Sequence, residues 1–273
     1  MRFPFVSGLV GRIRGDDGLE RELVAVLGRG RVESGAGALK LYSRDGSVTR
    51  GGRAGIVCFP ETTAEVSACV ATAARRGRPF VPRGAGTGLS GGAVPCEDPV
   101  MVVTTRMDDI HEVDVERRLA WVGPGVVNLD LSRHLEGTGL HFAPDPSSQQ
   151  ACTIGGNVAE NSGGVHCLKY GVTTNNILGL EMVLMNGDVI RLGGRHLDAE
   201  GYDLLWVMTG SEGLLGVITE VTVRLLKQPD TARALLIGFP SNEHAGDCGA
   251  REERGARPRA RQFRLLVSCP CVA

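Results

Sequence analysis

Five glycines lie within the eleven residues Pro82-Arg83-Gly84-Ala85-Gly86-Thr87-Gly88-Leu89-Ser90-Gly91-Gly92. Glycine buries no side chain and loses more backbone entropy on folding than any other residue, so core packing does not explain this run. Glycine does provide accessible amide N–H groups and turns with positive φ, and both features suit a phosphate cradle. Apolar segments flank the run closely, whereas flexible linkers lack such flanks. We therefore interpret residues 82–92, called the glycine loop below, as a phosphate-binding loop.

Residues 86–91 within the glycine loop also match the dinucleotide fingerprint G-x-G-x-x-G. That fingerprint binds a dinucleotide only when a helix begins inside it and points its N-terminus at the pyrophosphate. Here Gly92 and Pro95 follow, and no helical period appears before the apolar stretch at 99–104. We therefore expect a loop that connects two strands, and this disfavours an NAD-linked dehydrogenase.

Hydrophobic periodicity and turn residues predict the secondary structure of the rest of the chain. We expect strands at 55–59, 79–82, 99–104, 110–114, 119–122, 177–185, 188–192, 215–226 and 235–240, and helices at 18–27, 62–76, 127–135 and 203–207. Thr62 and Glu65 form a capping box, and Asp16 and Asn128 are the expected N-caps of two other helices. The dipeptide Asn186-Gly187 between two strands strongly indicates a hairpin. The polar, glycine-rich segment at 28–53 is interpreted as a connecting loop.

A second glycine-rich cluster, at 153–164, contains two Gly-Gly pairs that bracket one or two helical turns. The i, i+4 spacing of Asn157 and Asn161 predicts both carboxamides on one helix face. A carboxamide both donates and accepts hydrogen bonds, so it suits heterocycle edges and phosphate oxygens. The small residues around it allow a flat ligand to approach closely. This cluster and the preceding Pro144–Ser148 are predicted to form a second part of the ligand site.

The composition is that of an ordinary globular protein, with 273 residues and a formal net charge of −1. Aromatic residues make up only 4% of the chain and no basic face accompanies them, which argues against a nucleic-acid partner. The eight cysteines show no zinc-ligand spacing, so we expect no metal site and reduced thiols in the cytoplasm. We expect neither a membrane span nor a secretory signal, because the apolar runs are too short.

Four motifs, in order along the chain, resemble the FAD-binding module of the vanillyl-alcohol-oxidase/PCMH flavoprotein superfamily. They are Arg83–Gly88, Asp145–Ser148, Thr153–Asn157 with Asn161–Gly164, and Gly210–Gly213 with Gly216–Glu220. Within the superfamily, the sequence is most similar to the glycolate oxidase FAD-linked subunit and to FAD-dependent D-lactate dehydrogenases.

The resemblance covers about residues 40–230 and implies an α+β fold. We expect a PCMH-type FAD-binding domain of two α/β subdomains, at about 54–107 and 108–230, with the cofactor between them. A helical lead-in at 1–39 would precede this domain. The C-terminal cap domain of the family is expected to be missing.

The resemblance also implies which residues bind FAD. The glycine loop would hold the pyrophosphate by its backbone amides, through Arg83, Gly84, Ala85, Gly86, Thr87, Gly88, Ser90 and Gly91. The second cluster would contact the pyrophosphate and the isoalloxazine side, through Thr153, Gly155, Gly156, Asn157, Asn161 and Gly164. Asp145 and Ser147 are further residues expected to bind the cofactor. The adenosine part would lie near Glu212, Gly216 and Ile218. Members with covalent flavin often carry a histidine in the glycine loop; this chain has none there, which implies non-covalent FAD.

The activity implied by the resemblance is oxidation of a small D-2-hydroxy acid such as glycolate or D-lactate, with hydride transfer to flavin N5. The family's substrate arginine, metal-binding histidines and base lie mainly in the cap domain, so no catalytic residue is assigned here. His166 is a minor candidate for a residue that faces the flavin ring. An iron–sulfur partner subunit is a further expectation from the family.

The last segment, 231–273, is expected to be an irregular tail. Residues 241–273 contain six arginines and no lysine, with no sustained helical or strand period. This suggests a shift of reading frame near residue 241 and hence a truncated family member. The alternative function is therefore a non-catalytic FAD-binding fragment or subunit that needs another polypeptide for turnover.

Overall fold

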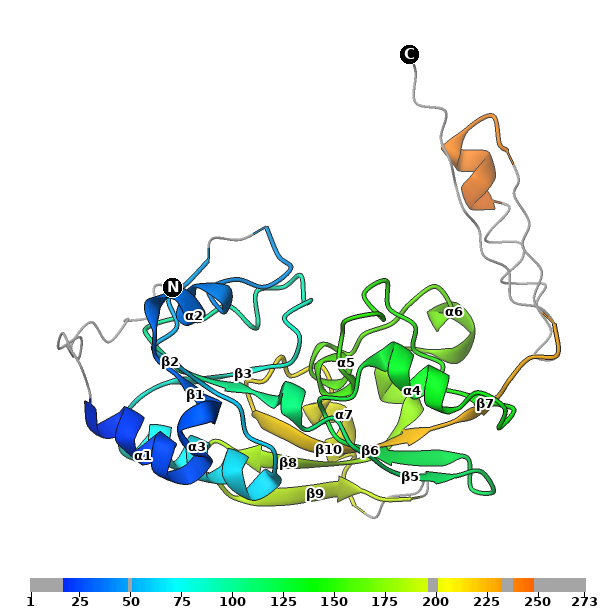
Figure 1. Cartoon of the computed structure of the whole chain (residues 1–273). Helices are drawn as coiled ribbons and strands as arrows, with labels where there is room; N and C mark the ends of the chain where they lie inside the picture. The colour runs from blue at the N-terminus through cyan, green and yellow to red at the C-terminus, as the bar shows by residue number, and fades with distance from the viewer. Residues whose placement is uncertain (1–16, 49–50, 196–200, 232–237, 248–273) are drawn as a thin grey trace. The chain divides into compact units, whose positions relative to one another are not determined.

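The computed structural model describes residues 17–48, 51–195, 201–231 and 238–247 (Figure 1). Its contacts divide the chain into two compact units, which are described separately. Unit 1 comprises Met1–Met107, Met182–Ile190 and Gly213–Thr219, and unit 2 comprises Asp108–Glu181, Arg191–Glu212 and Glu220–Ala273. The domain boundaries expected at residues 40, 54 and 231 stay predictions.

Unit 1 is built on a four-stranded sheet with the order β1-β2-β4-β3. Its strands are β1 (Val32–Glu33), β2 (Ile56–Cys58), β3 (Phe80–Arg83) and β4 (Val100–Val103). Strand β4 pairs in parallel with both β2 and β3, whereas β1 joins β2 antiparallel at the edge. The central strand β4 is buried along its whole length, as expected of a parallel strand that is covered on both faces.

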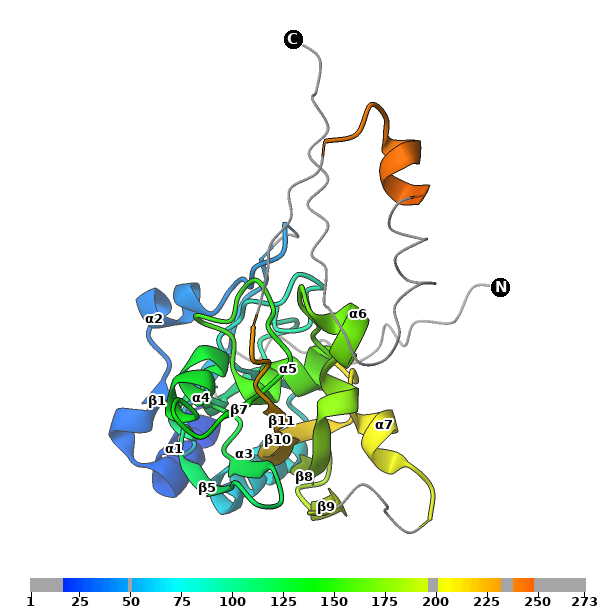
Figure 2. The same cartoon turned by 90° about the vertical axis from the view of Figure 1, so that its right-hand side faces the viewer.

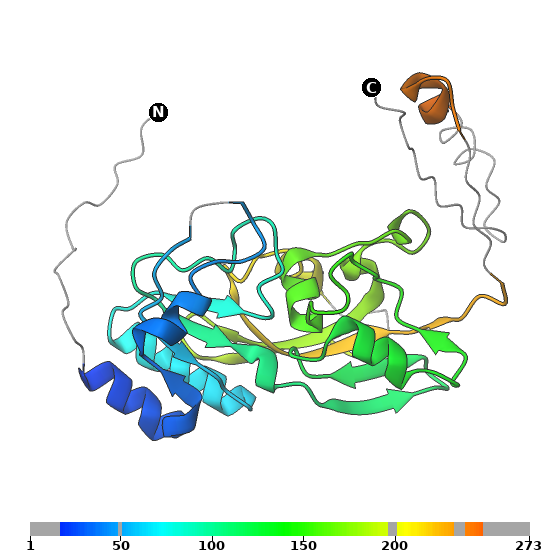
Figure 3. The same cartoon turned by 45° about the horizontal axis from the view of Figure 1, so that its top comes forward.

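Helices cover both faces of this sheet. On one face, α1 (Asp17–Leu27) and α3 (Thr63–Arg75) lie side by side (Figures 1 and 3), and their apolar residues share a buried cluster with Val100 and Val102. On the other face, Met101 and Val103 pack with residues of and next to α2 (Ala36–Leu41). The predicted N-terminal helix is confirmed, although Asp16 lies outside the described residues.

The interpretation of 28–53 as a connecting loop is wrong. This segment contains a 3-10 turn (Arg29–Arg31), β1 and α2. Strand β1 has only two residues, too few to show an alternating pattern in the sequence. It is held in place by pairing with β2 and by the burial of Val32, and both depend on tertiary contacts.

The N-terminus of α3 has the predicted cap. Thr62 Oγ1 accepts a hydrogen bond from the Glu65 amide at 3.2 Å, and the Glu65 carboxylate accepts one from the Glu61 amide at 2.8 Å. We expect Thr62→Ala to lower the free energy of unfolding by about 1 kcal/mol, because the Glu65 amide loses its acceptor. Urea unfolding measures this change. Thr62→Ser keeps the hydroxyl and should unfold like the parent; equal losses in both variants would contradict the capping explanation.

A five-stranded sheet has the order β5-β6-β10-β8-β9. Its strands are β5 (Ile110–Asp114), β6 (Leu119–Val122), β8 (Ile177–Leu184), β9 (Val189–Gly193) and β10 (Gly216–Arg224). The division between the two units falls within β8, β9 and β10. The Asn186-Gly187 hairpin is confirmed: the Leu184 amide donates to Asp188 O at 2.8 Å, and Gly187 has a φ of 93°.

The strand predicted at 215–226 is interrupted after Arg224. A second short strand, β11 (Leu226–Lys227), pairs antiparallel with β7 (Leu140–His141) in a separate two-stranded sheet. Neither of these strands was predicted, because two residues are too few to show an alternating pattern in the sequence.

The helices after β4 are short. They are a 3-10 turn at Thr104–Arg106, α4 (Asn128–His134), α5 (Ile154–Glu160), α6 (Cys167–Tyr170), a 3-10 turn at Thr173–Asn176 and α7 (Leu204–Met208). Within unit 2, α5 and α6 lie on the same side of β10 (Figures 1 and 2). None of the helices in the described part of the chain has the length and apolar character needed to cross a bilayer.

Asn128 does not cap α4, contrary to the prediction. Val127 occupies the N-cap position, and no side chain caps this helix. Asn128 instead lies one residue inside the helix, where its buried side chain donates from Nδ2 to Pro144 O at 3.0 Å.

Residues 242–247 are helical, whereas the sequence predicts irregular chain there. Ser241 Oγ accepts a hydrogen bond from the His244 amide at 3.4 Å and so begins the first turn. Half of the strand predicted at 235–240 lies outside the described residues, and its other half, 238–240, is not a strand. The rest of the expected tail, at 232–234 and 248–273, also lies outside them.

Candidate functional site

The glycine loop connects β3 to β4 in unit 1 without forming a helix, as predicted. No amide from Gly84 to Gly92 donates a hydrogen bond to another described residue; the first to do so after them is Val94, to Gly91 O at 3.0 Å. Gly86 and Gly91 have φ values of 72° and 87°, in the left-handed region that favours glycine. The loop thus offers a run of unpaired N–H donors, which is what an anionic ligand requires.

Arg83 supports the loop from the last position of β3. Its buried guanidinium donates to Ala93 O at 3.2 Å and lies 5.5 Å from the centre of the Tyr42 ring. A Cβ atom at Gly86 would lie 2.1 Å from Arg83 Nη2, and the φ of 72° disfavours any residue other than glycine there. Burial lowers the pKa of Arg83 while nearby Asp45 acts in the opposite direction. Because arginine keeps its charge in proteins, the loop carries a fixed cation at its base.

The other site residues of unit 1 lie at the start of β10. Ile218 is buried there, and a Cβ at Gly216 would meet Val183 O at 2.4 Å. A Cβ at Gly213, just before β10, would lie 3.0 Å from Pro82 Cγ. The chain before β10 therefore contacts the residue that opens the glycine loop.

In unit 2 the second glycine cluster forms α5. Thr153 caps it, with Oγ1 accepting from the Gly156 amide at 3.3 Å. A Cβ at Gly155 would lie 2.6 Å from Pro124 Cβ, so glycine allows the helix to pack against that turn. Asn157 is 1% exposed, yet its Nδ2 has no oxygen or nitrogen acceptor among the described residues. Its neighbour is the Cys152 thiol, whose pKa is raised chiefly by burial and lowered by hydrogen bonds to Ser148 and Asn157.

Asn161 does not share a helix face with Asn157, so that prediction is wrong. Helix α5 ends at Glu160, and Asn161 is its C-cap with a left-handed φ of 49°. Its Oδ1 accepts from the Thr174 amide at 3.0 Å, which ties the following loop to the helix end. Glu212 lies next to α5, because its amide donates to Ala159 O at 2.9 Å.

Asp145 holds the turn that follows the second cluster. Its carboxylate accepts from the His166 amide at 3.3 Å and pairs with the His166 ring at Nδ1. A Cβ at Gly164 would lie 2.2 Å from Asp145 Oδ1 and 2.4 Å from its carbonyl oxygen. Ser147, two residues on, is exposed.

His141 was not singled out in the sequence, because nothing in its local pattern marks it. It lies in β7 with its ring 5.6 Å from that of Tyr170. Burial is the main cause that lowers the pKa of His141, and His166 and Lys169 lower it further. The turn at 164–170 thus joins Asp145, His166 and His141 into one polar group.

The predicted site residues therefore fall into two groups, one in each unit. The group in unit 1 consists of Arg83, Gly84, Ala85, Gly86, Thr87, Gly88, Ser90, Gly91, Gly216 and Ile218, and the group in unit 2 of Asp145, Ser147, Thr153, Gly155, Gly156, Asn157, Asn161, Gly164 and Glu212. Two observations, one in each unit, fit a phosphate ligand: the glycine-loop amides have no acceptor among the described residues, and the buried Nδ2 of Asn157 has no oxygen or nitrogen acceptor among them.

Comparison with known proteins supports this reading. Glycolate oxidase subunit GlcD of Escherichia coli (strain K12) is 50% identical over 205 residues, which are 75% of this chain and 41% of the relative. D-lactate dehydrogenase of Archaeoglobus fulgidus is 42% identical over 209 residues, which are 76% of this chain and 47% of the relative. A solved structure of alkyldihydroxyacetonephosphate synthase has the same fold, with a TM-score of 0.77 at 22% identity over 88% of this chain and 50% of that chain.

The FAD binding domain family matches residues 54–193, about half of the chain, and this chain belongs to that family. The predicted α+β fold of the PCMH type and FAD as the cofactor are confirmed. The chain spans less than half the length of either relative, so activity, substrate and partners are treated below as proposals.

Proposed function

We propose that this chain binds FAD non-covalently and serves an oxidoreductase that acts on small D-2-hydroxy acids. The observation that carries the proposal is the run of unpaired amides from Gly84 to Gly92, in a chain of the FAD binding domain family. The substrate class is supported by the relatives, which are named for glycolate and D-lactate. One of them is named as a subunit, which supports a partner polypeptide, and an iron–sulfur protein is the partner that we propose.

The described residues supply binding and orientation. The amides of the glycine loop would donate to pyrophosphate oxygens, with the Arg83 cation at the base of the loop. The Asn157 carboxamide would donate from Nδ2, and the Asp145–His166 pair would hold the turn at 164–166 in place. The chemistry that FAD supplies is acceptance of a hydride from the substrate.

A second candidate function is FAD binding without turnover, in a subunit that needs another polypeptide. The described residues include the cofactor site that we propose, but we assign none of them as the base for the substrate hydroxyl. Reduction of a dye by the purified chain with glycolate or D-lactate distinguishes the two candidates. Turnover by the chain alone supports the enzyme, and flavin binding without turnover supports the subunit.

Replacement of Asn157 by leucine tests the binding site itself. We expect the Kd for FAD to rise about tenfold, because a buried donor to the cofactor is lost. The ligand-free chain should be at least as stable as the parent, since Nδ2 makes no hydrogen bond to a described oxygen or nitrogen. Flavin fluorescence titration and urea unfolding measure the two quantities. Exposed Gln150→Leu is the control and should change neither; unchanged FAD affinity in Asn157→Leu would remove Asn157 from the site.

A further inference from the structure

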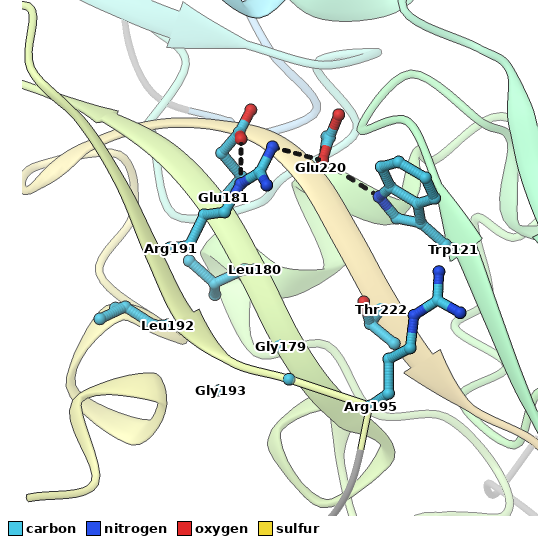
Figure 4. Close-up of a pocket in the computed structure, with 11 residues that line it drawn as sticks. Trp121, Gly179, Leu180, Glu181, Arg191, Leu192, Gly193, Arg195, Glu220 and Thr222 are labelled. Atoms are coloured by element: carbon cyan, nitrogen blue, oxygen red, sulfur yellow. Dashed lines mark hydrogen bonds and ion pairs between the residues drawn. The ribbon is translucent and has the colours of Figure 1, made fainter. Parts of the chain in front are cut away.

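A hollow of about 200 Å³ opens on the five-stranded sheet within unit 2 (Figure 4). Its lining comes from β6, β8, β9, β10 and the residues just after β9. The charged and aromatic lining residues are Trp121, Glu181, Arg191, Arg195 and Glu220, and we call this site the sheet hollow. None of them belongs to the proposed FAD site.

Two glycines shape the sheet hollow. A Cβ at Gly179 would lie 2.8 Å from the Gly194 amide nitrogen and 3.0 Å from Leu192 O. Gly193 has a φ of 69°, and a Cβ there would lie 2.2 Å from Leu178 O. A larger residue fits at neither position, so the backbone itself keeps this part of the lining free of side chains.

The charges in and around the hollow do not balance. Arg191 Nε donates to Glu181 at 2.6 Å, and Arg195 donates to Glu112 at 2.6 and 3.2 Å, so each arginine already has a close carboxylate. Glu220 is different (Figure 4): its Oε2 accepts from Trp121 Nε1 at 3.1 Å, and its nearest cation, Arg191 Nη2, is 3.9 Å away.

Both contacts of Glu220 use the same oxygen. No residue in the described part of the chain bonds to Oε1, and the side chain is only 22% exposed. Burial, followed by the charge of Glu181, raises the pKa of Glu220; the Trp121 hydrogen bond, Arg191 and His111 lower it by less. The hollow therefore contains one carboxylate whose Oε1 has no partner among the described residues and whose ion pair with Arg191 is long, so a closer cation would stabilise it.

The aromatic lining adds a second feature suited to a cation. The Trp121 indole lies beside the Glu220 carboxylate, to which its Nε1 donates. The centres of the His111 and Trp121 rings are 4.8 Å apart. An indole attracts a cation placed over its face. A guanidinium group also matches a carboxylate geometrically, because it donates two parallel hydrogen bonds.

We propose that the sheet hollow binds a small organic cation with a guanidinium or ammonium head, which contacts Glu220 Oε1 and the Trp121 ring. Its volume equals that of about six or seven water molecules, enough for such a head and a short apolar stem. Within the described residues, no group of three or more His, Cys, Asp or Glu side chains could hold a metal ion. An anion would meet Glu181 and Glu220, and an apolar ligand would bury Glu220 without a partner. This proposal is independent of the proposed flavin function.

Trp121 provides the readout. The chain has two tryptophans, so Trp206→Phe leaves Trp121 as the single indole of the full chain. Ethylguanidinium chloride is titrated into this variant at constant ionic strength, with ethylurea as the neutral probe of the same shape. We expect a saturable change in Trp121 emission with ethylguanidinium and none with ethylurea. The proposal is overturned if neither probe saturates or if both act alike.

Glu220→Gln separates the charge from the shape of the site, because glutamine still accepts from Trp121 Nε1. We expect it to weaken ethylguanidinium binding at least tenfold, whereas Glu136→Gln, an exposed glutamate outside the hollow, leaves it unchanged. Glu220→Gln should fold well, since an acid with a raised pKa destabilises the folded state when ionised. Its thermal midpoint at pH 7 should equal or exceed that of the parent. Equal affinity in a folded Glu220→Gln variant would overturn the assignment.

Discussion

Gly164→Ala is expected to raise the Kd for FAD about a hundredfold and to lower the free energy of unfolding by about 1–3 kcal/mol. The new Cβ would lie 2.2 Å from Asp145 Oδ1 and 2.4 Å from Asp145 O. The carboxylate could rotate away, but only by giving up its bonds to His166, and the carbonyl oxygen belongs to the backbone. The turn must therefore move, together with the residues proposed to contact the cofactor. Flavin fluorescence titration and urea unfolding measure the two effects.

Gly37→Ala is the matched control for this substitution. Gly37 lies in α2, and a Cβ there would meet no atom within 4 Å. Alanine should stabilise this helix slightly, by about 0.5–1 kcal/mol, and should leave FAD affinity unchanged. If Gly164→Ala bound FAD as tightly as Gly37→Ala, the turn at 164–166 would have no part in the site.

Met101→Ala is expected to lower the free energy of unfolding by about 2–5 kcal/mol. Met101 is fully buried in β4, the strand that pairs with both β2 and β3, and it packs with Val57, Val81 and Val103. Alanine would leave a cavity in the layer that supports the start of the glycine loop. Urea unfolding followed by circular dichroism gives the size of the loss.

Met185→Ala is the control for the core substitution, because Met185 is 53% exposed in the turn after β8. We expect it to change the free energy of unfolding by less than about 0.5 kcal/mol. Similar losses at both positions would show that side-chain burial in β4 does not determine the stability of this chain.

The sequence predicted correctly those elements whose signal lies in neighbouring residues of the chain. The glycine loop, the Thr62 cap and the Asn186-Gly187 hairpin each depend on residues that are neighbours in the chain. The two-residue strands β1, β7 and β11 lack such a signal, because they exist only through pairing with distant segments. Asn128 and Asn161 were assigned to the wrong roles for a related reason. Their bonds go to Pro144 O and to the Thr174 amide, on loops whose positions no local pattern reveals.

In the candidate site, too, contacts between distant segments could not be predicted from the sequence. The motifs identified its residues, but not that Asn157 Nδ2 is buried without an oxygen or nitrogen acceptor or that His166 pairs with Asp145. The sheet hollow was not anticipated at all. Glu181 and Glu220 lie on different strands, and the charge of Glu220 matters only because folding brings it near Glu181 and away from water.

The parallel strands β3 and β4 are joined by the glycine loop, whereas most parallel pairs are joined by a helix. A crossover helix satisfies its own backbone, but the amides from Gly84 to Gly92 find no acceptor among the described residues. Phosphate oxygens would therefore complete the hydrogen bonding of a connection on which the sheet depends. By mass action, a ligand at one hundred times its Kd adds about 2.7 kcal/mol to the stability of the state that binds it. Supply of the cofactor would then set how much of this chain is folded, so that FAD acts as a structural component as well as a reagent.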